Sequence, residues 1–157
     1  MVNSDLKIRT KDYALSVIRL FAALPKRTET QILGRQLLRS GTSVGAQYRE
    51  ATRAKSNLDF ISKIEGALQE LEESEYWLEL LSESGFCAAD GVAAIKKETG
   101  ELKGIFVSIV RNTKAKSKAL KPYLSDPGFS DLPGLSLILY PFARILLSIL
   151  YPFAFIL

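Results

Sequence analysis

The stretch 33-LGRQLLRSGTSVGAQYREATR-53 carries two opposed stripes of side chains. At about 100° per residue, as in an α-helix, its apolar side chains share one side: Leu33, Leu37, Val44, Tyr48 and Ala51. Its basic side chains fall on the opposite side: Arg35, Arg39, Arg49 and Arg53. The pattern predicts one amphipathic helix of about five turns.

The two stripes stay in phase only if this helix runs unbroken through Ser40-Gly41-Thr42-Ser43. A glycine inside a helix costs about 1 kcal/mol relative to alanine, so a packing advantage is expected to offset it. Gly41 and Gly45 flank the apolar stripe, and small residues allow two helices to approach closely. A phosphate-binding loop is excluded because no lysine follows at the required spacing.

Three further segments have helical periodicity. The first precedes Leu24-Pro25, and Thr28 with Gln31 predicts a capping box for the basic-striped helix. Ser56 and Asp59 predict the start of the third helix, which Ser84-Gly85 ends. The apolar positions of the first, third and fourth helices are Tyr13, Ala14, Val17, Ile18, Phe21; Phe60, Ile64, Ala67, Leu71, Ser74, Leu78, Leu81; and Val92, Ile95, Thr99, Leu102, Phe106, Ile109.

These segments predict an all-α fold, an antiparallel up-down-up-down four-helix bundle with an extra C-terminal apolar tail. The fourth helix is expected to fade before Pro122. We therefore divide the chain into a bundle over residues 1–121 and a linker with a hydrophobic tail over residues 122–157.

The composition narrows the possible functions. The chain has 157 residues, no histidine, one cysteine and a net charge of +4. That charge is uneven along the chain: +7 over residues 1–56, −6 over 57–113 and +3 over 114–157. The polar start, Met1 to Lys11, does not resemble a signal peptide, and the lone Cys87 suits a reducing compartment, so we expect a cytoplasmic protein.

The missing histidine excludes Ser-His-Asp and Cys-His catalysis. It also removes the Glu-x-x-His motif that a di-iron bundle needs, so Glu65, Glu72, Glu79 and Glu83 predict a charged face instead. We expect a protein that is not an enzyme and that needs no metal and no cofactor.

Three motifs, in order, resemble a known bacterial family. They are Ser40-Gly41-Thr42-Ser43-Val44-Gly45-Ala46-Gln47-Tyr48-Arg49-Glu50-Ala51, Asp59-Phe60-Ile61-Ser62-Lys63 and Glu73-Ser74-Glu75-Tyr76-Trp77-Leu78-Glu79-Leu80-Leu81. Residues 5–118 are similar to the four-helix-bundle proteins encoded in 23S rRNA intervening sequences. They are also similar to the accessory protein of diversity-generating retroelements. Gln47 stands where the family usually has asparagine.

The resemblance implies a ring, typically a homopentamer. In the retroelement relatives a basic surface binds nucleic acid and a reverse transcriptase. We therefore expect a homo-oligomer, with RNA or DNA and a reverse transcriptase or another nucleic-acid enzyme as candidate partners.

The candidate nucleic-acid-binding residues are Arg35, Arg39, Arg49, Arg53 and Lys55. Arginine and lysine contacts to phosphates give salt-dependent affinity that does not depend on sequence. The alternative is that these side chains pair with the acidic third helix, within the bundle or between subunits. In that case the protein would be a structural protein whose charges serve self-assembly.

Four other residues are assigned to helix packing: Gly41, Gly45, Phe60 and Trp77. Tyr76 and Trp77 could instead stack on bases, and Cys87 is expected to be a small apolar filler.

The tail contains a direct repeat, in which Ile138-Leu139-Tyr140-Pro141-Phe142-Ala143 recurs from Ile149 to Ala154. Residues 134–157 are long and apolar enough to cross a bilayer, although Arg144 and two prolines oppose a simple spanning helix. Three interpretations stay open for this segment: an unselected extension, a membrane segment, or an element that packs on the bundle or ring.

Overall fold

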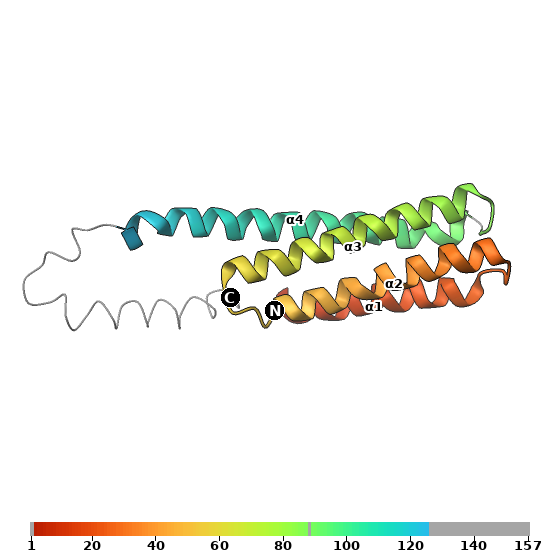
Figure 1. The fold of residues 1–157 in the computed structure, drawn as a ribbon, viewed down its shortest axis with the longest axis horizontal. Helices are drawn as coiled ribbons and strands as arrows, with labels where there is room; N and C mark the ends of the chain where they lie inside the picture. The colour runs from red at the N-terminus through yellow and green to blue at the C-terminus, as the bar shows by residue number, and fades with distance from the viewer. Residues whose placement is uncertain (1, 88, 126–157) are drawn as a thin grey trace, which may run out of the picture.

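The computed structural model describes residues 2–87 and 89–125 as four helices. They are α1 (Val2–Ala23), α2 (Thr28–Ala51), α3 (Asn57–Glu83) and α4 (Ala89–Ser125). Each helix runs antiparallel to the next and packs on it, and α4 returns to α1 (Figure 1). The predicted up-down-up-down bundle is confirmed for these residues. The predictions for the tail, including a membrane segment over 134–157, lie outside the described residues.

The α2 helix runs unbroken through Ser40-Gly41-Thr42-Ser43, as predicted. The Thr42 and Ser43 hydroxyls donate to carbonyl oxygens one turn back, at 2.7 and 2.8 Å, so both hydroxyls are hydrogen-bonded within the continuous helix. The helix ends at Ala51, however, and the prediction that it includes Arg53 was wrong. The amide of Arg53 bonds to the Glu50 carbonyl at 2.9 Å, which tightens the chain into the turn before α3.

The helix ends follow local capping chemistry. The Ser56 hydroxyl accepts the Asp59 amide at 3.1 Å, which confirms the predicted start of α3. Gly85 has φ 71°, the left-handed conformation that commonly ends a helix.

The predicted capping box at Thr28 was wrong, because α2 begins one residue earlier than the box requires. The Arg27 carbonyl already accepts the Gln31 amide at 2.9 Å, and the Gln31 side chain donates to Pro25 instead.

The predicted apolar seams of α3 and α4 form most of the core. In the predicted stripe of α1, Tyr13 and Val17 are buried, but the assignment of Ile18 to the core was wrong, since it is 43% exposed. Six of the seven seam positions of α3 are buried, and Phe60 is half-buried, with Ile61 buried beside it. On α4 the predicted position Ile109 is only half-buried, and the next residue, Val110, is buried instead. Both shifts occur at seam ends, because a straight helix drifts against a seven-residue repeat.

One polar residue from each helix lies buried in the centre of the bundle. The hydroxyls of Tyr13 and Thr99 are 3.0 Å apart, and those of Ser74 and Ser40 are 2.9 Å apart. Burial raises the pKa of Tyr13, while hydrogen bonds with Thr99 and Ser74 act in the opposite direction. These bonds join all four helices through one layer, which we call the polar layer.

The α4 helix is the longest and continues past the start of α3 (Figure 1). The prediction that it ends before Pro122 was wrong, since it reaches Ser125. Pro122 therefore lies within the last turn of α4.

Candidate nucleic-acid interface

The α2 helix presents the two predicted faces. Leu37, Val44, Tyr48 and Ala51 are buried, and Leu33 is half-buried. The basic side chains are exposed on the opposite side: Arg35, Arg39 and Arg49, followed in the turn by Arg53 and Lys55. The environments of these five cations differ, and the difference decides which charges are available to a ligand.

Arg39 is tied to α3. Its guanidinium forms an ion pair with Glu73, whose carboxylate also accepts the Trp77 indole N–H at 3.1 Å. The charge of Arg39 is therefore largely balanced within the bundle, as the ion-pairing alternative expects.

Arg49 bonds to backbone oxygens rather than to a carboxylate. One guanidinium nitrogen donates to the Gly45 carbonyl at 2.8 Å, and the other approaches the Lys7 carbonyl on α1 at 3.4 Å. These contacts hold the side chain across the α1–α2 boundary without neutralising its charge.

Arg35, Arg53 and Lys55 are exposed. Within residues 5–87 and 91–119, the ion pairs involve none of these three side chains and not Arg49. The backbone N–H of Lys55 donates to Asp59 at 3.1 Å, which leaves the Lys55 ammonium outside that contact. Four of the five candidate residues thus keep an uncompensated charge in this part of the chain.

Glycines position α2 against α1. A Cβ on Gly41 would lie 2.8 Å from a Val17 methyl, and one on Gly45 would lie 3.4 Å from the Thr10 carbonyl oxygen. Sequence reasoning missed Gly34, where a Cβ would lie 2.8 Å from Phe21 and 2.9 Å from Leu24. Its spacing of seven residues from Gly41 is the signal that could have revealed it.

The two aromatic residues assigned to the third helix differ in exposure. Trp77 is half-buried and packs against the core, whereas Tyr76 is 53% exposed, with its ring centroid 5.0 Å from that of Trp77. Phe60 also packs against the core. Gln47 covers Gly66 across the α2–α3 boundary. Cys87 is half-buried, and burial raises the pKa of its thiol.

Three of the glutamates of α3, Glu65, Glu73 and Glu75, form ion pairs with neighbouring helices. Glu65 and Glu75 form ion pairs with Lys114 and Lys103 of α4. Nowhere in the described part of the chain do three acidic or thiol side chains gather as metal ligands would.

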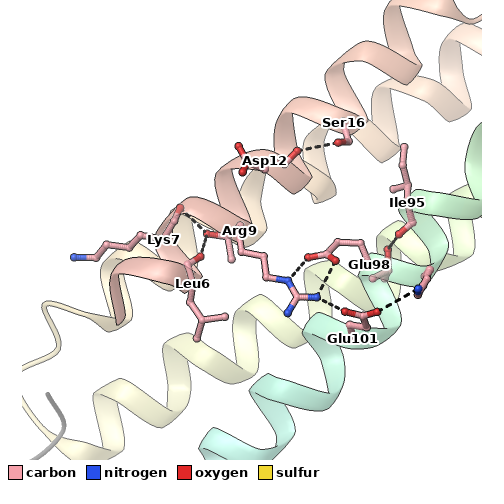
Figure 2. A network of polar contacts seen from close by, with 11 residues as sticks. Leu6, Lys7, Arg9, Asp12, Ser16, Ile95, Glu98 and Glu101 are labelled. Carbon is pink, nitrogen blue, oxygen red and sulfur yellow. Dashed lines mark hydrogen bonds and ion pairs between the residues drawn. The ribbon is translucent and has the colours of Figure 1, made fainter. Parts of the chain in front are cut away.

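Sequence reasoning also missed an ion-pair network between α1 and α4. Figure 2 shows Arg9 reaching from α1 to Glu98 and Glu101 of α4. Two guanidinium nitrogens bond to the two Glu98 oxygens, at 2.6 and 2.8 Å, and these contacts raise the pKa of Arg9 despite its partial burial. The network spans the boundary where the helices pack least. No sequence pattern links residues so far apart.

None of the helices that the structure describes is long and apolar enough to cross a membrane.

The chain matches the model of the 23S rRNA-intervening sequence protein family over residues 4–108. It is also similar to a crystal structure from Bacteroides thetaiotaomicron, that of a protein of unknown function from the S23 ribosomal protein family. That pair has 34% identity and a TM-score of 0.66, and the match covers 71% of this chain and 99% of the other. No curated protein matches the chain. On its four-helix fold and this match, the chain belongs to the 23S rRNA-intervening sequence protein family.

Proposed function

We propose that this protein is a non-enzymatic, ring-forming bundle of the bacterial cytoplasm that binds nucleic acid, or a nucleic-acid-processing partner, through its exposed cations. The observation that carries the proposal is that Arg35, Arg49, Arg53 and Lys55 form no ion pair in the described residues, although α3 is rich in glutamates. Exposed arginine and lysine are the side chains that contact phosphates.

The family gives the ligand class some support. Its name refers to sequences inserted in 23S rRNA genes, and the similar crystal structure carries the name of a ribosomal protein family. The retroelement accessory proteins, which this sequence resembles, suggest a homopentameric ring and a reverse transcriptase as a partner. RNA is therefore the first ligand to test, with DNA second.

A specific observation favours the second candidate, a structural protein that only self-assembles. Ile8, Ile18 and Ile32 are between 43% and 60% exposed on α1 and α2, and the Arg39–Glu73 pair uses charge to hold helices together. If the protein only self-assembles, we expect these isoleucines to become buried between copies of the chain.

Two measurements on the same sample distinguish the two candidate functions. We would measure the mass of the full chain by light scattering, and then RNA and DNA binding over a salt series starting near 50 mM. The proposal is supported if the logarithm of the binding constant falls linearly with log[salt], with a slope of about 0.7–0.9 for each phosphate contacted. A ring without binding at the lowest salt would favour the self-assembly function, and a monomer would eliminate the ring.

A further inference from the structure

The fold distributes the charged side chains of this protein unevenly between the two ends of the bundle. The start of α1, the end of α2 with its following turn, the start of α3 and the second half of α4 lie at one end (Figure 1). Contacts between neighbours define this end: Arg49 with the Lys7 carbonyl, Glu50 with Lys63, and Glu65 with Lys114.

This end is strongly basic. Residues 5–11, 45–66 and 108–119, which we call the basic end, hold 11 Lys and Arg against 4 Asp and Glu, a net charge of +7. The rest of the bundle, residues 12–44, 67–87 and 91–107, holds 8 basic and 10 acidic residues, a net charge of −2. The bundle is therefore electrostatically polar along its length.

Three of the four acidic residues of the basic end are already engaged, and Asp5 is the fourth. Glu50 and Glu65 form ion pairs with Lys63 and Lys114, and Asp59 accepts the Lys55 amide. The exposed cations that take part in no ion pair of the described residues are Lys7, Lys11, Arg49, Arg53, Lys55, Arg111 and Lys118. They come from α1, α2, the turn after it, and α4.

We propose that the basic end, rather than the stripe along α2, is the surface that contacts the phosphodiester backbone. This inference rests on the proposed function. It keeps Arg49, Arg53 and Lys55 as contact residues, leaves out Arg35, and adds Lys7, Lys11, Arg111 and Lys118. Charge complementarity selects the ligand: a cluster of cations without carboxylate partners fits a dense row of phosphates. The long α4 helix extends the surface beyond the start of α3 (Figure 1).

The test compares two triple variants of the full chain that remove the same charge. One changes the basic end, Arg53→Gln, Lys55→Gln and Arg111→Gln. The control changes three exposed cations outside it, Arg19→Gln, Lys26→Gln and Arg27→Gln. Circular dichroism and thermal unfolding check that both variants fold. The probes are a fluorescein-labelled 20-nucleotide RNA and a DNA of the same sequence.

We expect the basic-end variant to bind about tenfold or more weakly, with a salt slope smaller by about 2–3, because each lost phosphate contact reduces the slope by about 0.7–0.9. The control is expected to stay within about twofold of the wild type. Equal weakening in both variants, or none in the basic-end variant, overturns the inference and leaves nucleic-acid binding intact. Wild-type protein that binds neither probe, but binds vesicles of anionic lipid, overturns both proposals.

Discussion

The Tyr13 hydroxyl lies 3.0 Å from the Thr99 hydroxyl and joins α1 to α4, the neighbouring helices that contact each other least. Thr99 donates its own proton to the Ile95 carbonyl at 2.8 Å, so Tyr13 is the donor between the two hydroxyls. Both residues are buried at 2% exposure or less. A buried hydrogen bond of this kind favours one alignment of two helices, because a shifted alignment would take the Thr99 acceptor away from the buried Tyr13 hydroxyl.

The first prediction concerns this bond. Tyr13→Phe should lower the free energy of unfolding by about 1 kcal/mol, a typical net value for one hydrogen bond. A double-mutant cycle with Thr99→Val should show that the two changes are not additive. Thermal and urea unfolding measure both. The control is Tyr76→Phe, which alters a half-exposed tyrosine and should change stability by less than about 0.5 kcal/mol.

The second prediction concerns close packing at Gly41. Gly41→Ala would place a Cβ 2.8 Å from a Val17 methyl and should destabilise the protein by about 1–3 kcal/mol. Gly104→Ala is the matched control, because its added Cβ meets nothing within 4 Å and it lies inside α4. Helix propensity should then stabilise the protein by up to about 1 kcal/mol. Effects of the same sign in both variants would contradict this account of the α1–α2 boundary.

The third prediction concerns the Arg9 network of Figure 2. Arg9→Met keeps the aliphatic part of the side chain but removes the contacts with Glu98 and Glu101. This substitution should lower the free energy of unfolding by about 1 kcal/mol and speed hydrogen exchange of the α1 amides. Lys97→Met removes only an exposed pair with Glu101 at 4.0 Å and should have little effect on stability. If the two variants unfold alike, Arg9 does not hold α1 on α4.

The fourth prediction concerns Glu70, whose pKa is raised mainly by burial and whose Oε2 is buried without a hydrogen-bond partner in the described residues. Between the ordinary pKa of a glutamate and the raised pKa of Glu70, the folded state binds more protons than the unfolded state at this site. The contribution of Glu70 to stability therefore falls as pH rises through that window. Glu70→Gln should therefore stabilise the protein at pH 7, by up to about 1 kcal/mol, and much less at pH 4.

Unfolding of the Glu70 variant at the two pH values checks the sign. The control is Glu72→Gln, an exposed change on the same helix that removes the same charge. An equal gain at pH 4 and pH 7 would show that the carboxylate of Glu70 is not the cause.

The sequence predicted the helices better than their contacts. The seam of α3 and the opposed faces of α2 repeat at helical spacing, so periodicity predicted them. The ends of α2 and α4 were less predictable. The Arg53 amide bonds to the Glu50 carbonyl in a turn after α2, whereas α4 continues through Pro122 to Ser125.

The candidate site shows the same division. That Arg35, Arg39 and Arg49 share a polar face follows from their spacing. That Arg39 pairs with Glu73 while Arg49 bonds to backbone carbonyls depends on how α3 and α1 flank α2, which spacing within one helix cannot reveal.

By itself, the sequence determined the four helices of the described residues, most of the apolar face of each, and the basic–acidic–basic order of charge along the chain. The tertiary structure alone decided where those charges lie. Antiparallel packing brings the start of α1 and the end of α2 to the end of the bundle that α4 reaches, so two basic segments far apart in the chain meet there (Figure 1). The physical reason is that hydrophobic burial pairs whole helix faces, and the charges then take the positions that this pairing imposes.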